Sequence, residues 1–186
     1  IWVVLNGGTN MAIFYLIRHG KPDYSYGDTH GFIGQGHDLA PLEQNAIKDV
    51  IEASKDSRLK KAQIIVSSPY TRALQTASVI SKETGLDIMV EPDIREWQPD
   101  LTFQYKNSDE MKKYYNDYIE NNGVYPNGEK RKWETKEQLR SRVMSVINKY
   151  KQKYDTVIIV AHKMAFQSIC DCGDMKPAEI LKVNFE

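Results

Sequence analysis

The stretch 13–20, Ile-Phe-Tyr-Leu-Ile-Arg-His-Gly, constrains the fold of this chain more than any other feature of its sequence. A run of β-branched and aromatic residues is typical of a fully buried strand, and this run stops at two cationic side chains. Ligands of open α/β sheets bind at the carboxyl ends of strands, so Arg18 and His19 lie where a site is expected. Gly20 would let the backbone approach a bound group closely. On these three residues alone, an ordinary surface pair at a strand end explains the pattern equally well.

Two further apolar runs end in the same manner. Residues 62–66 lead through a serine-proline helix start to Arg72, and residues 156–160 lead to His162. A helix N-terminus with free amide groups and an arginine in its first turn is a ready anion site. Taken alone, Arg72 is better explained as a surface charge and His162 as a hydrogen-bonded structural histidine. Because both come after buried strands, as His19 does, the three positions together indicate one anion-binding site.

Buried strands alternate with helical patterns along the chain, which favours an α/β fold. The predicted fold class is a three-layer α/β/α sandwich with a mostly parallel central sheet. Residues 21–41 are expected to form a long loop that acts as a wall or lid of the site. The other expected strands are 87–90 and an edge strand at 179–185. The expected helices are 42–54, one between Pro69 and Gly85, 108–121, 135–154 and 165–170. The apolar stripe of the helix 42–54 consists of Leu42, Ala46, Val50 and Ile51, and that of the helix 135–154 consists of Leu139, Val143, Val146 and Ile147.

Residues 1–10 differ in character from the rest of the chain, and Met11 opens the strand pattern directly. We therefore expect residues 1–10 to be a cloning scar or an upstream extension, and residues 11–186 to form a single domain. The chain shows no membrane-length apolar run and no signal-peptide pattern. Its two cysteines, Cys170 and Cys172, are too few for a disulfide framework or a zinc site. These features predict a cytoplasmic protein with reduced thiols.

The charge balance bears on the partners. The 25 Lys and Arg residues are matched by 25 Asp and Glu residues, so the formal net charge is zero. This balance argues against nucleic acid or an anionic membrane as the main partner. An anion site must then be local, built from a few residues rather than from a basic surface.

A candidate acid completes the set of reactive groups. Glu96 lies between Arg95 and Trp97, and an apolar neighbour raises the pKa of a carboxyl group by disfavouring its charged form. Two histidines, two arginines and such an acid are the groups required to transfer a phosphoryl group through a phosphohistidine. A neutral imidazole nitrogen attacks phosphorus, cations hold the phosphoryl oxygens, and the acid protonates the leaving oxygen.

The sequence also resembles the histidine phosphatase superfamily, the phosphoglycerate mutase-like family. The matching motifs occur in the family's order and cover nearly everything from Ala12 to the C-terminus. Together they are far more specific than any one of them. They are Leu16-Ile17-Arg18-His19-Gly20; Gly36, Asp38 and Pro41-Leu42; Ser67-Ser68-Pro69 through Arg72-Ala73 and Gln75-Thr76-Ala77; Ile94-Arg95-Glu96; Gly128-Glu129; and Val160-Ala161-His162.

The resemblance implies a role for each matched residue. His19 would be the nucleophile that becomes phosphorylated, and His162 would join the catalytic group beside it. Arg18 and Arg72 would line the phosphate pocket together with His162. Glu96 would protonate the leaving group and later serve as base for the attacking water. The family needs no metal and no organic cofactor, and its sheet carries helices on both faces with the site at the carboxyl ends of the strands.

Several positions depart from the family's pattern. Pro22 and Ser25 stand where many members carry threonine and asparagine; whether Ser25 offers its hydroxyl or amide to phosphate is left open. The stretch after Glu96 lacks the usual glycines, which leaves Glu129 as a distant second candidate for the acid. Lys163 replaces a frequent glycine and would place another cation at the pocket.

Hydrolysis of a small phosphorylated metabolite is the favoured function. Mutases of the family are typically longer, whereas this chain is short from Met11 and its variable segment, residues 108–133, is modest. A non-catalytic module that binds a phosphorylated ligand is the alternative from another class; the intact histidines and arginines argue against it. The edge strand could pair in a homodimer. The substrate is not specified; candidates to line its pocket, each also explained as surface or packing residues, are His30, His37, the tyrosines of 105–118 and Trp133.

Overall fold

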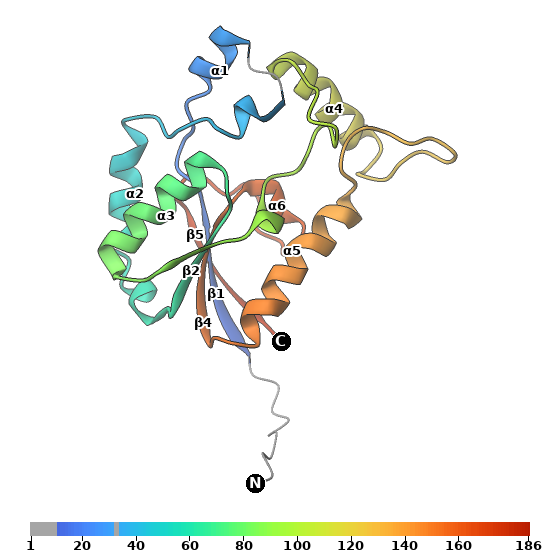
Figure 1. Cartoon of the computed structure of the whole chain (residues 1–186). Coiled ribbons are helices and arrows are strands. Elements are labelled where there is room, and N and C mark those ends of the chain that lie inside the picture. The colour runs from blue at the N-terminus through green and yellow to red at the C-terminus, as the bar shows by residue number, and fades with distance from the viewer. Residues whose placement is uncertain (1–10, 32–33) are drawn as a thin grey trace.

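Five strands form one sheet in the spatial order β3-β2-β4-β1-β5 (Figure 1). The computed structural model describes residues 11–31 and 34–186, so the expectation for residues 1–10 lies outside the described part. The strands are β1 (Ala12–Arg18), β2 (Ile64–Ser67), β3 (Ile88–Val90), β4 (Thr156–Ala161) and β5 (Ile180–Phe185).

The pairing of the strands sets the position of the site. Strand β4 lies between β1 and β2, parallel to both, and β3 continues the parallel set beyond β2. In this register Arg18 is the partner of Ala161, so His19 and His162 come directly after their strands at the same edge of the sheet. The edge strand β5 runs antiparallel to β1. The predicted mostly parallel sheet is therefore confirmed.

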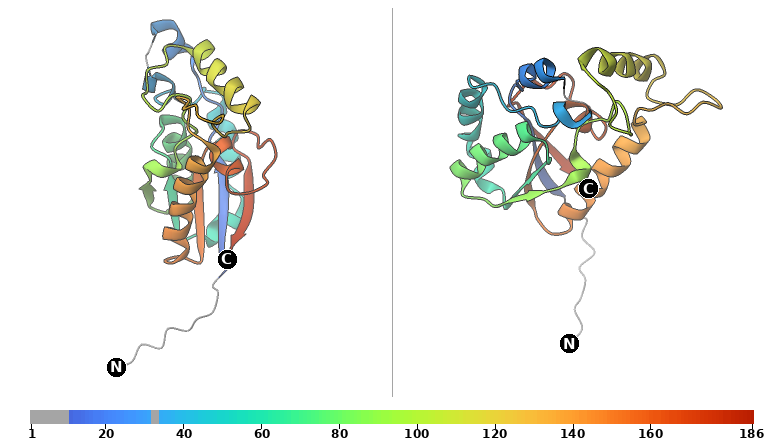
Figure 2. Two further views of the ribbon diagram at one scale, coloured as in Figure 1. Left: turned by 90° about the vertical axis from the view of Figure 1, so that its right-hand side faces the viewer. Right: turned by 45° about the horizontal axis from the view of Figure 1, so that its top comes forward.

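Helices cover both faces of the sheet, which confirms the predicted three-layer sandwich (Figures 1 and 2). Helices α2 (Ala46–Ser54) and α3 (Thr71–Thr84) lie on one face, and α5 (Lys136–Lys151) and α6 (Lys163–Gln167) lie on the other. Two more helices, α1 (Ser25–His30) and α4 (Ser108–Glu120), lie over the carboxyl ends of the strands. Short 3-10 helices occupy Gly34–His37, Ser57–Lys61 and Pro92–Ile94.

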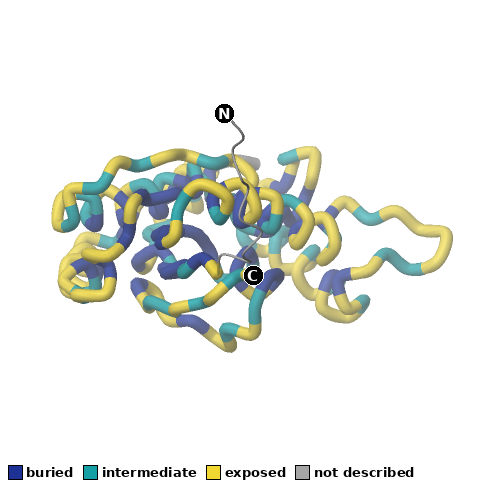
Figure 3. Tube along the Cα trace, turned by 90° about the horizontal axis from the view of Figure 1, so that it is seen from below, coloured by how far each residue is buried: buried dark blue, intermediate teal, exposed yellow. Residues whose placement is uncertain are grey.

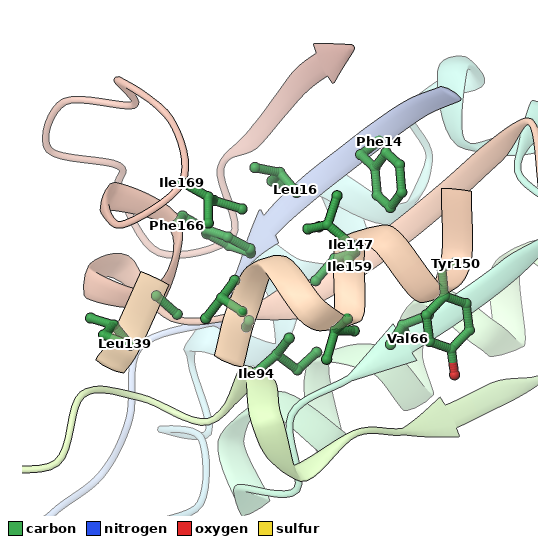
Figure 4. Packing of buried hydrophobic residues seen from close by; sticks show 14 of the residues in the cluster. Phe14, Leu16, Val66, Ile94, Leu139, Ile147, Tyr150, Ile159, Phe166 and Ile169 are labelled. Atoms are coloured by element: carbon green, nitrogen blue, oxygen red, sulfur yellow. The ribbon is translucent and has the colours of Figure 1, made fainter. Parts of the chain in front are cut away.

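The first strand is buried on both faces, as its sequence predicts. Phe14 and Leu16 pack in the core between the sheet and α5, while Tyr15 and Ile17 pack toward α3. Figure 4 shows the first of these cores, and Figure 3 shows buried positions along the central elements. Full burial of a side chain of this kind contributes about 1.5–3 kcal/mol. The strand end that carries His19 is thus held rigidly from both sides.

Helix α5 matches its prediction closely. Thr135 caps the helix in a capping box with Gln138. The box satisfies two backbone N–H groups that would otherwise lack partners at the helix start. All four apolar residues of the predicted stripe are buried, although the helix ends at Lys151 rather than at 154.

Three boundaries or faces differ from the predictions. Residues 21–41 are not a plain loop, because Asp23 accepts the backbone N–H of Ser25 and starts α1, which ends at Gly31 in the left-handed conformation. Helix α2 begins at Ala46 rather than at Leu42, and Ile51 is 42% exposed instead of packing inward.

Within the described residues, no helix is long and apolar enough to cross a bilayer.

Candidate active site

His19 lies at the end of β1, with its backbone N–H bonded to the Ala161 carbonyl at 3.0 Å. Its Nδ1 atom is 2.7 Å from the carbonyl oxygen of Gly20. A carbonyl oxygen can only accept, so Nδ1 carries the proton and Nε2 keeps its lone pair. The side chain is 4% exposed. The local fold thus presents the atom that a nucleophilic histidine needs.

Gly20 is required by packing on the far side of the backbone. A Cβ atom there would lie 2.8 Å from Cγ2 of Val50 and 3.1 Å from Cδ2 of Leu42. The Gly20 N–H donates to the hydroxyl of Thr76 at 3.1 Å. The close approach seen here is to α2 and the loop before it, and the predicted approach to a bound group stays a prediction.

Arg72, the second residue of α3, is buried and faces His19. Its Nε donates to Nε2 of His19 at 3.2 Å, and its Nη1 donates to the His37 carbonyl at 2.8 Å. Its guanidinium lies 5.0 Å from the ring centroid of Tyr70. Arg18 donates through Nη1 to the Met175 carbonyl at 2.5 Å, and its buried Nε has no partner among the described residues.

His162 lies beside His19, with ring centroids 4.9 Å apart and planes inclined by 60°. Its Nε2 is 2.7 Å from Oγ of Ser68, and its buried Nδ1 has no hydrogen-bond partner in the described part of the chain. The edge of Tyr70 packs against the same ring at 5.1 Å. His162 is fully buried beside His19, is bound to Ser68 and, unlike the prediction, is not among the residues that line the cavity described below.

Both histidines are held neutral. Burial, with Arg72 as the next cause, lowers the pKa of His19 from 6.5 to about 3. The same two causes lower the pKa of His162 well below its usual value. Burial and a neighbouring guanidinium group both disfavour the protonated, positively charged form of an imidazole. His19 is therefore in its nucleophilic, uncharged form throughout the neutral pH range.

Glu96 comes after the 3-10 turn at Pro92–Ile94 and is held by backbone amides. Its Oε1 accepts from the N–H groups of Trp97 at 2.9 Å and Ala165 at 3.2 Å, and its Oε2 accepts from Met164 at 3.4 Å. Burial raises the pKa of Glu96, and these hydrogen bonds and Arg72 oppose that shift. A carboxyl group with a raised pKa is suited to general acid catalysis.

Arg142 of α5 holds the segment that carries Glu96. It donates to the carbonyls of Asp93 at 2.8 Å, Arg95 at 2.7 Å and Glu96 at 2.9 Å. It also pairs with Glu134 through Nε at 2.5 Å and Nη2 at 2.8 Å. Both side chains of this pair are largely buried. No sequence pattern indicates this support, because the partners of Arg142 lie 8 to 49 positions away along the chain.

A cavity of about 260 Å³ joins these groups. It brings together four of the predicted site residues, Arg18, His19, Arg72 and Glu96. The rest of the wall comes from the residue before α1, from the end of the first 3-10 helix, from the segment 97–105, and from α4 and α6. Its other lining residues are Tyr24, His37, Asp38, Trp97, Pro99, Tyr105, Met111, Lys112, Tyr115 and Met164.

Asp38 is a second acid in the cavity wall, and sequence reasoning assigns it no role. Burial raises the pKa of Asp38 to about 6, against the opposing charge of Arg72. Its buried Oδ2 has no hydrogen-bond partner among the described residues. Its place in the family motif is the only sequence signal for it.

His37 links the two helices that cover the site. Its Nε2 lies 3.2 Å from Oδ1 of Asp28 on α1 and 3.3 Å from Oγ of Ser108 at the start of α4. Ser108 also donates to Asp28 at 2.9 Å. The ring of Tyr24 stacks on His37 at 4.7 Å. These contacts link α1 to the start of α4 beside the cavity.

Several predicted site residues lie elsewhere. Ser25 is exposed, is not part of the cavity lining, and donates its backbone N–H to Asp23. Glu129 pairs with Arg131 on an exposed loop and does not line the cavity, whereas Glu96 does. Lys163 pairs with Asp174 at 2.5 Å and does not line the cavity.

The expected pocket-lining residues divide into two groups. His37, Tyr105 and Tyr115 line the cavity. Trp133 is fully buried and donates to Asp117 at 2.7 Å, so it is a core residue. His30 is exposed and stacks on its neighbour Tyr26. Across residues 11–31 and 34–186, no three His, Cys, Asp or Glu side chains gather in a group that could hold a metal ion.

The sequence matches known proteins over most of its length. A family model described as the histidine phosphatase superfamily (branch 1) matches residues 14–185. A Bacillus subtilis protein named uncharacterized phosphatase PhoE is 28% identical over 161 residues, which cover 86% of this chain and 76% of that protein.

Solved structures share the fold. A mycobacterial glucosyl-3-phosphoglycerate phosphatase aligns with a TM-score of 0.69 over 92% of this chain and 89% of its own, at 19% identity. Bacillus stearothermophilus YhfR aligns with a TM-score of 0.70 over 92% and 90%, at 18% identity. At these identities the likeness to solved structures shows the fold alone.

Proposed function

Because the chain belongs to the histidine phosphatase superfamily, we propose that it is a phosphomonoesterase that hydrolyses a small phosphorylated metabolite through a phosphohistidine on His19. The observation that carries this proposal is the contact between His19 Nδ1 and the Gly20 carbonyl. It leaves Nε2 unprotonated in a cavity that also contains the guanidinium groups of Arg18 and Arg72 and the carboxyl groups of Glu96 and Asp38. The names of the relatives support hydrolysis: one is a phosphatase from Bacillus subtilis and another a glucosyl-3-phosphoglycerate phosphatase.

The first half-reaction transfers the phosphoryl group to the protein. The lone pair of His19 Nε2 forms a bond to phosphorus as the bond between phosphorus and the ester oxygen breaks. Arg18 and Arg72 stabilise the charge on the phosphoryl oxygens. Glu96 gives its proton to the departing oxygen, so the alcohol leaves neutral.

The second half-reaction releases phosphate. Glu96, now ionised, takes a proton from a water molecule as that water attacks phosphorus. The bond between phosphorus and Nε2 breaks, and His19 regains its lone pair. His162, fixed by Ser68, holds a neutral ring against the nucleophile. The two guanidinium groups supply the positive charge for both steps, so we propose that no metal ion is needed.

The test is turnover of 4-nitrophenyl phosphate by the purified protein with and without a chelator. A parallel sample is denatured in base, where a phosphohistidine is stable, and its peptides are analysed by mass spectrometry. We expect turnover that survives chelation, a phosphate label on His19 and loss of turnover in His19→Ala with an unchanged circular dichroism spectrum. Undiminished turnover in His19→Ala would overturn the mechanism, and turnover restored only by added metal would overturn the metal independence.

A further inference from the structure

We infer that the leaving group of the substrate extends past Met164 into a second cleft between α4, α5 and α6. The enzyme then prefers phosphomonoesters whose alcohol carries an apolar segment with an anionic end. This inference rests on the proposed function, since it names the substrate class of the same site.

The second cleft is a separate hollow of about 330 Å³. It is open to solvent, and both apolar and polar side chains line it. Helix α4 supplies one wall, and the start of α5 and helix α6 supply the other. The lining residues are Tyr115, Tyr118, Ile119, Asn122, Lys136, Leu139, Met164, Gln167 and Ser168.

The cleft adjoins the active-site cavity, because Tyr115 and Met164 line both. Met164 also donates its backbone N–H to Glu96. In the proposed reaction the ester oxygen must lie beside Glu96 to receive its proton. The rest of the leaving group therefore starts next to Met164 and Tyr115, the two residues that separate the cavity from the cleft. Methionine adapts its shape readily and suits such a partition.

The cleft accounts for the exposure of two apolar side chains on α4. Tyr115 is 40% exposed and Ile119 is 51% exposed, and they lie four positions apart on one face of α4. Tyr118 on the same helix packs inward against Trp97 and Trp133, with ring centroids 5.0 and 5.3 Å away. The helix is thus anchored by Tyr118 while its neighbours stay open to water. An apolar segment lying on Tyr115 and Ile119 would remove that surface from water, worth about 25 cal/mol per Å².

The polar part of the lining favours an anionic end. Lys136 is exposed, and no ion-pair partner lies within 4 Å of it in the described part of the chain. It is the charged side chain of the cleft lining, which also includes the amide side chains of Asn122 and Gln167. A carboxylate at the far end of the leaving group would find a cation and hydrogen-bond donors there.

The test is the dependence of kcat/KM on the alcohol, because alkyl phosphates share a similar leaving-group pKa and differ chiefly in binding. The substrates are ethyl phosphate, octyl phosphate and octyl phosphate with a terminal carboxylate. We expect the wild-type protein to prefer octyl over ethyl phosphate, and the carboxylate over octyl, each by about tenfold or more. Ile119→Asp should reduce the first ratio about tenfold, and Lys136→Glu should reduce the second by a similar factor.

The matched control is Ile51→Asp on α2, an isoleucine of similar exposure outside both hollows. It should leave both ratios at their wild-type values. Turnover of ethyl phosphate with ratios near one, or ratios unmoved by Ile119→Asp and Lys136→Glu, would overturn the inference and leave the proposed function standing. No turnover of any of the three esters, nor of 4-nitrophenyl phosphate, would overturn both.

Discussion

His19 Nδ1 lies 2.7 Å from the carbonyl oxygen of Gly20, so the chain's own backbone sets the tautomer of the proposed nucleophile. The acceptor is the next residue in sequence, and its position is fixed by the packing of Gly20 against Val50. With the pKa of His19 lowered to about 3, no base is needed to free Nε2. In the proposed reaction, proton donation by Glu96 is then the step most sensitive to the leaving group.

We expect Glu96→Gln to slow hydrolysis by about 10²–10⁴-fold for esters with poor leaving groups and by much less for 4-nitrophenyl phosphate. The amide keeps the size of the side chain but cannot supply the proton. The measurement is kcat/KM across aryl phosphates of rising phenol pKa, which should fall more steeply in the variant. Glu129→Gln, on the exposed loop, is the control and should behave as the wild type does. Equal slowing for all esters would count against Glu96 as the acid.

The protonation of Glu96 should also determine how kcat falls at high pH. Burial raises the pKa of Glu96 above its usual 4.5, and only the protonated form can donate. For alkyl phosphates, kcat should therefore fall as the pH rises through this raised pKa. In Glu96→Gln that fall should disappear, because no proton is lost there. A fall that persists in the variant would assign the titration to another group.

The parts of the site predictable from sequence are those fixed by local patterns. Each of Arg18, His19 and His162 lies at or just after the end of an apolar run, and a parallel sheet brings such ends to one edge. Arg72 is indicated by a helix start after a buried strand. The capping residue Thr135 is equally local. These signals span a few residues, so no tertiary knowledge is required to find them.

The rest depends on contacts between distant segments. Arg142 is one of several charged residues on α5, and only the fold shows that it binds the carbonyl of Glu96. Asp38 is distinguished from most other acids by its place in the lining of the cavity. Ser25 is a candidate because of its position after a motif, but the turn at Asp23 directs it to the start of α1. Composition and periodicity do not indicate such contacts between residues that are far apart in the sequence.

The lowered pKa of His19 can be tested through stability. The unfolded chain binds a proton at His19 near pH 6.5, and the fold binds it only near pH 3. Between these values the unfolded state holds more protons, so this histidine reduces stability as the pH falls, by about 1.4 kcal/mol per pH unit. As the pH falls from 6 to 4, the free energy of unfolding of His19→Asn should rise relative to that of the wild type by about 1.4 kcal/mol per pH unit. Denaturant unfolding at fixed pH measures the difference.

The comparison between variant and wild type is needed because other groups act in the opposite direction. The fold raises the pKa of Asp38 to about 6, so this residue adds stability as the pH falls toward 4. Its contribution is common to both proteins and cancels in the difference. Above about pH 7.5 the two curves should run parallel. Curves that stay parallel down to pH 4 would show that His19 titrates near its ordinary pKa of about 6.5.

Arg142 should contribute to both stability and rate. Its removal in Arg142→Met leaves Glu134 buried without its partner, which costs about 3–5 kcal/mol for pairs of this kind. The segment 93–96 also loses its anchor, so kcat should fall along with the free energy of unfolding. Arg58→Met breaks an exposed pair with Asp56 and should cost less than about 1 kcal/mol. A loss in Arg142→Met as small as that control would mean that the buried pair does not support the fold.

Gly20→Ala distinguishes two reasons for a glycine after the nucleophile. A Cβ at this position would lie 2.8 Å from Cγ2 of Val50, closer than side chains pack. Overpacking of this kind costs about 1–3 kcal/mol, and Val50→Ala alone costs roughly 2 kcal/mol through the atoms it removes. If packing is the reason, the double variant should cost less than the sum, with a coupling of about 1 kcal/mol or more.

Unfolding free energies of the four proteins in this cycle measure that coupling. In Gly20→Ala, overpacking should move the carbonyl of residue 20 away from His19 Nδ1 and lower kcat. In the double variant the new methyl group occupies the space that the Val50 side chain vacates, so the carbonyl keeps its place and kcat recovers together with stability. The alternative is that Gly20 clears space for the bound phosphate group. In that case Gly20→Ala would raise KM with little change in stability, and Val50→Ala would not rescue it. Strictly additive stability costs together with a raised KM would therefore assign Gly20 to the ligand side of the backbone.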